Sequence, residues 1–81
     1  MNNNEKYKKL FVEALSLKDE SVNNNLEYNG VPEWDSIGHM ALISAIEEAY
    51  SISMETDDII DFSSYKKGME ILKTKHNLKF D

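Results

Sequence analysis

Cysteine is absent from this chain of 81 residues. Disulfide bonds and thiolate metal sites therefore cannot hold the fold together, so helix packing has to suffice. Any thiol chemistry has to come from an added cofactor. The two histidines, His39 and His76, lie far apart in the sequence without cysteine partners, so we expect no metal site.

A long apolar run is missing as well. Residues 1–6 form no apolar signal core, and no later segment approaches the roughly 20 apolar residues that span a bilayer. We therefore expect a soluble, cytoplasmic protein with no membrane partner. A chain this short buries only about 60% of its unfolded surface and has no material for a second core. This predicts one domain over residues 1–81, with its core at about 5–75.

Basic residues are missing from the middle of the sequence. From Asp19 to Tyr65 there are eleven acidic residues and no Lys or Arg, which gives a charge of −11. The rest has nine Lys and four acidic residues, or +5, and the two parts add to the net charge of −6. The acidic middle should repel nucleic-acid phosphates and attract basic protein surfaces. Ordinary solubilising charge is the alternative explanation.

Apolar residues recur at helical spacing in the first part of the chain. They predict a helix from about Glu5 to Leu17. The residues on its apolar face are Tyr7, Leu10, Phe11, Ala14 and Leu15. Turn-forming residues follow from Lys18 to Asp35. Connections this long are uncommon in compact domains and are often functional.

Three further helices are predicted. The second runs from Ser36 or Ile37 to Tyr50, with Ser36 as its N-cap, and the fourth opens at Ser63 or Ser64 and fades near Lys75. Between them, a brief third helix is capped at residues 56–58. We expect these last two helices to bury Ile59, Ile60, Phe62, Tyr65, Gly68, Met69 and Leu72, and residues 77–81 to form a tail. No strand pattern competes, so the fold class is all-α: a small four-helix bundle with a long loop between helices 1 and 2.

The two faces of the second helix differ in character. At 100° per residue, the buried face carries Leu42, Ala45, Ile46 and Ala49. The opposite face carries Ser36, Ile37, Met40, Ala41, Ser44, Glu47 and Glu48. An outward Ile beside an outward Met is typical of a docking surface. The alternative is that another helix of the same chain covers both.

Ser36 allows three interpretations. It could be a plain N-cap, worth typically about 1 kcal/mol relative to alanine. It could be a nucleophile, but His39 is the only nearby base and nothing supplies an oxyanion hole or a substrate pocket. It could be the attachment point of a phosphate-linked cofactor, because a helix N-terminus offers unpaired N–H groups and the positive end of the macrodipole.

The motif Asp35-Ser36-Ile37, placed after a long loop and at the start of a helix in an acidic chain of this size, resembles the acyl carrier protein family. The resemblance runs from about Glu5 to Leu72. The other residues that carry it are Leu42, Ile46, Glu47, Glu48, Tyr50, Ile52, Thr56, Asp57, Asp58, Ile59, Phe62, Ser63 and Ser64.

This resemblance implies a monomeric, non-catalytic carrier. In the family, the serine of an Asp-Ser-Leu motif carries 4'-phosphopantetheine, which a Mg²⁺-dependent phosphopantetheinyl transferase installs from coenzyme A. By resemblance this cofactor belongs on Ser36, with Ile37 in place of the usual leucine. The arm supplies the thiol for thioesters, and acyl- or aminoacyl-loading and acyl-transferring enzymes with basic patches are the expected partners. The implied partner-recognition residues are Asp35, Ile37, Met40, Ala41, Glu47 and Glu48.

Several residues depart from the family pattern of fatty acid synthesis, which usually reads Gly-Ala/Met-Asp-Ser-Leu-Asp followed by further acids. Here Trp34 precedes the motif, and Gly38, His39 and Ala41 follow it. This favours a dedicated pathway, such as polyketide, nonribosomal peptide or saccharide assembly, over housekeeping fatty acid synthesis. The alternative of a different class is a small acidic helical interaction module without a prosthetic group, in which Ser36 is only a cap.

Three other features have structural explanations. We expect Trp34 to be buried beneath the loop, because a lone aromatic residue is usually packing. Gly38 costs roughly 1 kcal/mol inside a helix, which a close approach by the loop or the first helix would explain. A cluster of acidic residues lacks the spacing of a calcium loop and fits the first turn of a helix instead. Its members are Asp57, Asp58 and Asp61.

Overall fold

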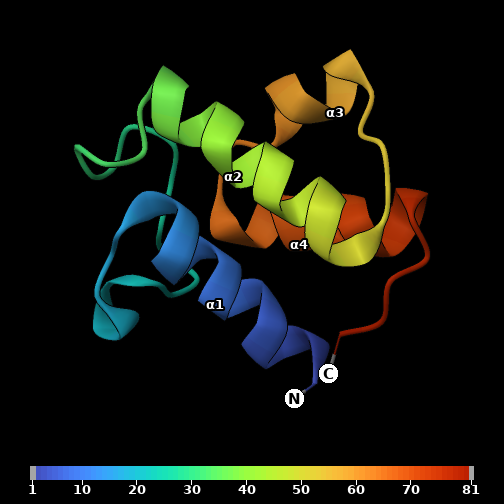
Figure 1. The fold of residues 1–81 in the computed structure, drawn as a ribbon, viewed down its shortest axis with the longest axis horizontal. Coiled ribbons are helices and arrows are strands. Elements are labelled where there is room, and N and C mark those ends of the chain that lie inside the picture. Colours follow the sequence, from blue (N-terminus) through green and yellow to red (C-terminus); the bar gives the residue numbers. More distant parts are fainter. Residues whose placement is uncertain (1, 81) are drawn as a thin grey trace.

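A computed structural model describes residues 2–80, which fold into four α-helices (Figure 1). They are α1 (Asn3–Leu15), α2 (Ser36–Tyr50), α3 (Thr56–Asp61) and α4 (Tyr65–Lys75), with a 3₁₀ turn, η1 (Asp19–Ser21), after α1. Within residues 2–80 the only β-type pairing is an isolated bridge between Glu27 and Ser64. The all-α prediction is confirmed. None of these helices is long and apolar enough to cross a membrane.

Side-chain caps fix where the helices begin. The Asn2 Oδ1 accepts a 2.9 Å hydrogen bond from the Glu5 N–H, so α1 begins and ends two residues earlier than predicted. The Ser64 Oγ accepts a 3.0 Å bond from the Lys67 N–H, which confirms Ser64 as the start of the fourth helix. Both bonds satisfy N–H groups that have no partner inside a first helical turn.

Aromatic side chains fill the centre of the bundle. The Phe11 ring lies 4.9 Å from Tyr7, 4.9 Å from Tyr65 and 5.3 Å from Trp34, measured between ring centroids. Phe62 stacks on the same ring. These five side chains come from α1, α4 and the loops before α2 and α4, and each is nearly or completely buried. The core therefore joins the long loop to the helices, and the burial predicted for Trp34 is confirmed.

The burial predicted for Ile60 is wrong, and one buried residue, Ile43, was not predicted. Ile60 is 71% exposed, because on the short helix α3 it lies about 100° from Ile59, which packs against the core. Ile43, absent from the predicted buried face of α2, is 1% exposed beside Leu42 and Ile46. The buried face of α2 is thus wider than a single helical stripe. Ala45, Ala49 and Met69 are only half-buried.

The long loop is tied to the beginning of α4. The Tyr28 N–H donates to the Ser63 carbonyl, and the Tyr65 N–H donates to the Leu26 carbonyl, both at 2.9 Å. Val22 and Leu26 are buried, so the loop is pinned by its own apolar residues as well. This anchoring delivers a fixed backbone to the start of α2.

The segment after α4 is more ordered than a tail. Phe80 packs edge-on against Tyr7 at 5.5 Å, and Leu78 is half-buried against the core. The Asn3 Nδ2 donates a 2.8 Å hydrogen bond to the Lys79 carbonyl, which brings residues 3 and 79 together near the two ends of the chain. The fourth helix ends at Lys75, as predicted, but residues 78–80 of the expected tail pack against the bundle. Asp81 lies outside the described residues.

Candidate functional site

Ser36 is the first residue of α2, and its side chain is exposed. The N-cap is Asp35, whose extended backbone lies just outside the helix and whose Oδ1 accepts a 2.8 Å hydrogen bond from the Gly38 N–H. The prediction that Ser36 caps the helix is therefore wrong. Because Asp35 already fills the cap, the Ser36 hydroxyl has no hydrogen-bond partner within residues 2–80.

Close packing behind Ser36 requires the glycine at position 38. A Cβ atom there would collide with the Glu33 carbonyl oxygen and would lie 3.1 Å from the Leu15 Cδ2. Both the loop and α1 thus approach this point, as predicted. The loop is closed on itself just before α2, because the Asn29 N–H donates to the Trp34 carbonyl at 2.9 Å. The position of Ser36 is therefore set by packing on the side of α2 that faces away from solvent.

His39 links the loop to α3 through both ring nitrogens. Its Nδ1 accepts a 2.9 Å hydrogen bond from the Trp34 Nε1–H, so the ring proton is on Nε2, which donates to the Ile59 carbonyl at 2.8 Å. The imidazole also stacks against the indole of Trp34. Neither nitrogen is free to take a proton from Ser36, so this histidine positions structural elements and is no general base.

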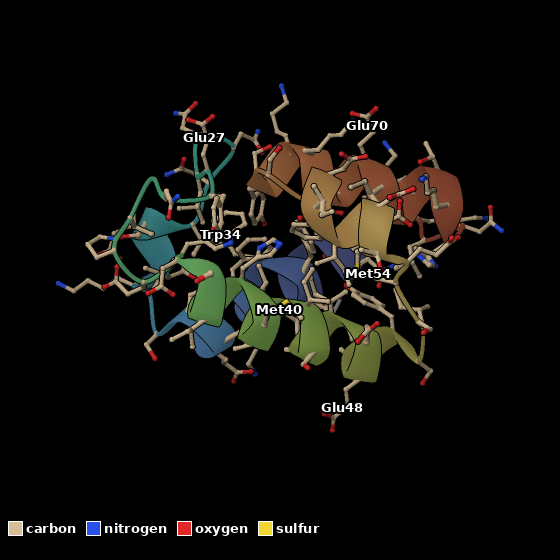
Figure 2. The ribbon with its side chains drawn as sticks, turned by 90° about the horizontal axis from the view of Figure 1, so that it is seen from above. Glu27, Trp34, Met40, Glu48, Met54 and Glu70 are labelled. Atoms are coloured by element: carbon tan, nitrogen blue, oxygen red, sulfur yellow. The ribbon has the colours of Figure 1, made fainter. Side chains whose placement is uncertain are left out.

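Most of the residues that we predicted to contact partners lie on the outer side of α2. Ile37 is 81% exposed and Met40 is 53% exposed. Within the described chain no other helix covers them, so the alternative that they are packed internally is wrong. Asp35, Ala41, Ser44 and Glu48 are exposed too, and Figure 2 shows the Glu48 side chain pointing away from the body of the molecule. Contact with a partner stays a prediction for all of them.

Glu47 differs from its neighbour Glu48. It is half-buried, and its Oε2 accepts a 2.8 Å hydrogen bond from the Met54 N–H. This bond braces the segment that connects α2 to α3, a role that sequence spacing alone does not reveal. Met54 itself is buried (Figure 2).

A shallow apolar groove opens between α2, α3 and the long loop. Its volume is about 250 Å³, and it is lined by Tyr28, His39, Ile59, Ile60, Phe62 and Ser63. Sequence patterns did not predict Tyr28 at this groove, because the residue lies in the long loop, where no helical spacing orients a side chain. Ile60 on α3 is exposed, as are Ile37 and Met40 on α2. The start of α2 therefore carries a hydroxyl, an acidic edge and an apolar surface together.

The acidic residues of α3 serve the helix and its packing. Asp57 and Asp58 lie in the first turn, as predicted, whereas the prediction is wrong for Asp61, which is the last residue of α3. Asp58 is 2% exposed and is paired with Lys75 at 2.6 Å, which raises the pKa of Lys75 through the hydrogen bond and the charge of this carboxylate. In residues 2–80, no three metal-binding side chains gather at a common point.

Comparison with known proteins places this geometry in a family context. No family model matches the chain. A curated relative, the acyl carrier protein of Buchnera aphidicola subsp. Schizaphis graminum (strain Sg), is 31% identical over 77 residues, covering 94% of this chain and 98% of the relative. The acyl carrier protein of Buchnera aphidicola subsp. Acyrthosiphon pisum (strain 5A) is 28% identical over 78 residues, covering 96% of each chain.

Proposed function

We propose, given that this chain belongs to the acyl carrier protein family and is a non-catalytic carrier, that Ser36 is the residue on which it carries its cargo. The cargo is attached through a 4'-phosphopantetheine arm. The observation that carries this proposal is the exposed Ser36 hydroxyl at the first turn of α2, left without a hydrogen-bond partner within residues 2–80 because Asp35 fills the cap.

The surroundings of Ser36 suit a phosphodiester. The hydroxyl is at the N-terminus of a helix of 15 residues, where backbone N–H groups and the positive end of the macrodipole favour an anion. Asp35 uses its carboxylate on the Gly38 N–H, which partly offsets its negative charge. The tight packing behind Gly38 keeps the start of the helix in place while the Ser36 side chain stays open to a modifying enzyme.

The arm supplies the thiol that this cysteine-free chain lacks, so that acyl or aminoacyl groups can be held as thioesters. The protein's own residues then deliver and present the cargo. In this proposal the chain acts as a monomer, because its role is to visit one partner enzyme after another.

Partner enzymes recognise the outer face of α2. Ile37 and Met40 present apolar side chains that fix the register of a complex, while Asp35 and Glu48 attract lysine and arginine patches. The small side chain of Ala41 lets a partner approach the helix closely. Glu47 contributes less than Glu48, because its carboxylate already braces Met54. Such contacts weaken with added salt, which suits a carrier that must be released.

The pathway we infer is a dedicated one, such as polyketide, nonribosomal peptide or saccharide assembly. The packing at Gly38 supports this inference, since the Glu33 carbonyl leaves no room for an acidic side chain there. His39 is likewise committed to Trp34 and Ile59. The first turns of α2 therefore lack the acidic residues that fatty acid synthesis enzymes usually meet.

Intact-protein mass tests the proposal. The protein is incubated with coenzyme A, Mg²⁺ and a broad-specificity phosphopantetheinyl transferase, and the expected product is heavier by one phosphopantetheine group. Ser36→Ala should stay unmodified, and Ser44→Ala, at an exposed position on the same helix, should be modified like the natural chain. If folded protein gains no mass with any of several transferases, the interaction module without a prosthetic group becomes the better explanation.

A further inference from the structure

We propose that the outer side of α4 is a second docking surface, and that it binds an acidic helix of another protein while the outer face of α2 stays open. We call this surface the lysine face, and it consists of Lys66, Lys67 and Lys73. The inference goes beyond the proposed function and does not depend on modification of Ser36. It adds a class of partner that the acidic edge of α2 does not attract.

Positive charge is concentrated on α4. Residues 65–75 contain four lysines and one acidic residue, so this helix carries +3 in a chain whose net charge is −6. The three residues of the lysine face are exposed and lie within an arc of about 120°, opposite the buried side of the helix. Glu70 lies in the same arc, and in Figure 2 its side chain points away from that of Glu48 on α2. The two docking surfaces are therefore on different sides of the molecule.

The lysine face has no ion-pair partner among residues 2–80. The two ion pairs found there involve other lysines, Lys8 and Lys75. Glu70 is four residues from Lys66 and three from Lys73, which is the spacing at which helical side chains meet, but it forms an ion pair with neither. The cations of this face are thus left for a partner to neutralise.

Two of these lysines lie at the end of α4 where a cation is unfavourable. Lys66 and Lys67 are in the first turn, at the positive end of the helix macrodipole, and that turn contains no acidic residue. Lys73, in the last turn, is at the favourable end. A charge that costs local stability and has no local partner is typical of a residue that serves binding.

A shallow hollow beside the lysine face gives the partner a place for one apolar side chain. Its volume is about 410 Å³, and it is lined by Asn24, Lys66, Met69, Glu70 and Lys73. The half-buried Met69 provides an adaptable apolar contact. Lys66 and Lys73 are seven residues apart, a rise of roughly 10.5 Å along the axis. A helix lying along α4 matches them with two acidic residues at the same spacing and an apolar residue between.

Other occupants fit this face less well. Nucleic acid would be repelled by the charge of −11 on residues 19–65. A membrane surface requires exposed large apolar side chains, and none of those in residues 2–80 is on α4; they are Tyr28, Ile37, Met40 and Ile60. A second copy would have to offer its acidic α2 surface, which lies on another side, so the contact would not close and would produce filaments.

A peptide titration tests the proposal on the natural chain, without an arm on Ser36. The probe is an alanine-based helical peptide of about 20 residues, with two glutamates seven residues apart and a leucine between them. Amide chemical shifts of the ¹⁵N-labelled protein report where it binds. We expect changes at residues 66–73 and at Asn24, and none along residues 36–48. A control peptide with glutamine in place of both glutamates should bind about tenfold more weakly.

Charge reversal on the protein provides the second arm of the test. Lys66→Glu/Lys73→Glu should raise the Kd of the acidic peptide about tenfold or more. The matched control is Lys9→Glu/Lys18→Glu, which makes the same change of net charge at two exposed lysines without ion pairs among residues 2–80. Its Kd should stay within about threefold of that of the natural chain. If the first variant does not fold, the shift map of the natural chain decides.

Four results would overturn the proposal. They are the absence of shift changes in α4, shift changes centred on α2, equal weakening by both double variants, and equal binding of the control peptide. Binding to phosphatidylglycerol vesicles through the lysine face, without binding to the peptide, would assign the face to a membrane instead. Sedimentation of the natural chain alone should show a monomer, and self-association that Lys66→Glu/Lys73→Glu abolishes would assign it to a second copy.

Discussion

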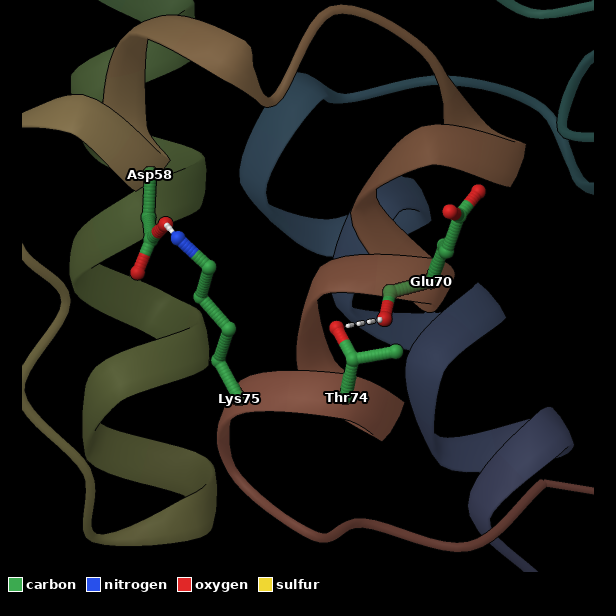
Figure 3. Close-up of polar contacts among 4 residues, drawn as sticks. All are labelled: Asp58, Glu70, Thr74 and Lys75. Atoms are coloured by element: carbon green, nitrogen blue, oxygen red, sulfur yellow. Dashed lines mark hydrogen bonds and ion pairs between the residues drawn. The ribbon is translucent and has the colours of Figure 1, made fainter.

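Asp58 on α3 and Lys75 at the end of α4 form an ion pair in which the carboxylate is buried and the ammonium group is partly in water. The Lys75 Nζ donates to the Asp58 Oδ1 at 2.6 Å (Figure 3). The Lys75 side chain is 54% exposed and the Asp58 side chain 3%. Thr74 directly precedes Lys75, and its Oγ1 donates to the carbonyl of Glu70, one turn earlier in α4, at 2.9 Å. The pair joins α3, the shortest α-helix of residues 2–80, to the last residue of α4.

Removing the lysine should therefore destabilise the fold. Lys75→Gln leaves the Asp58 carboxylate buried without its cation, and we expect a lower urea midpoint with an unchanged m-value. Lys73→Gln is the matched control, because Lys73 is exposed on the same helix, and its midpoint should stay within error of the natural chain. In a double-mutant cycle with Asp58→Asn, the combined loss should be smaller than the sum. Equal midpoints for both lysine variants would contradict this account.

Gly68 should not tolerate a methyl group. A Cβ atom at this position would collide with the Phe62 ring and would lie 2.5 Å from the Tyr7 hydroxyl. Alanine gains about 1 kcal/mol of helix propensity over glycine, but overpacking a core costs typically 1–3 kcal/mol. We expect Gly68→Ala to lower the free energy of unfolding by about 1 kcal/mol or more, measured by urea denaturation. The control Lys67→Ala, exposed and one residue earlier, should change it by less than about 0.5 kcal/mol. If Gly68→Ala were more stable than the natural chain, Phe62 and Tyr7 would have to pack less closely against position 68 than described.

Tyr7 should make the protein sensitive to alkali. Burial raises the pKa of Tyr7 well above its ordinary value of 10.0, and burial also raises the pKa of Tyr50 and of Tyr65. Above pH 10 the unfolded chain loses these phenolic protons while the folded chain keeps them, so the contribution of these tyrosines to stability is fully present below about pH 10 and is lost above it. One such proton contributes at most about 1.4 kcal/mol per pH unit. The measurement is the urea midpoint between pH 7 and 11.5.

The variant Tyr7→Phe separates the contribution of Tyr7 to the alkaline loss of stability from the contributions of Tyr50 and Tyr65. At neutral pH the variant should be less stable by about 1 kcal/mol, because the Tyr7 hydroxyl donates a buried 2.7 Å hydrogen bond to the Tyr65 carbonyl. Above pH 10 the stability of the variant should fall less steeply with pH than that of the natural chain. The difference between their free energies of unfolding should therefore become smaller. The pKa of Lys75, raised by Asp58, adds a loss in the same pH range that both proteins share. Parallel curves would exclude Tyr7 as a source of the alkaline loss.

Asp35 should have two separable roles. Asp35→Ala removes the cap on Gly38 and should cost about 1 kcal/mol of stability, while Asp35→Asn keeps an acceptor at the N-cap and should cost only a few tenths. Both variants remove the negative charge, so phosphopantetheine attachment should be slower for both than for the natural chain. Lowering the salt concentration should also raise their attachment rates less than it raises the rate of the natural chain. The measurements are urea denaturation and the initial rate of phosphopantetheine attachment at low and high salt. A normal rate for Asp35→Asn would limit Asp35 to capping.

Much of the fold could be predicted from local patterns. The apolar spacing of α1, the turn residues before Ser36 and the cap at Ser64 are signals within a few residues, and they gave the helices in order. Ile60 could not be placed from its neighbours, because a helix of six residues has too little periodicity to set which side faces the core. The sequence pattern likewise predicts an exposed Glu47, because the hydrogen bond that it accepts from the Met54 N–H depends on the fold of the segment between α2 and α3.

The candidate site divides in the same way. The position of Ser36 at a helix start follows from the sequence, but its role as first residue, with Asp35 as the cap, depends on one hydrogen bond to Gly38. The bridge from Trp34 through His39 to α3 joins segments twenty residues apart along the chain, and no pattern in the sequence indicates it. Long-range contacts of this kind appear only when the packing is known.

The site of the arm is the most direct test of the account. The modified protein is digested with trypsin, which leaves the segment 19–66 intact because it contains no lysine or arginine before Lys66, and tandem fragmentation then locates the added mass. The account predicts one phosphopantetheine group on Ser36, and a Ser36→Ala variant that keeps its stability within about 0.5 kcal/mol, since Asp35 provides the cap. The group on any other serine of this segment, or its presence in folded Ser36→Ala, would contradict it.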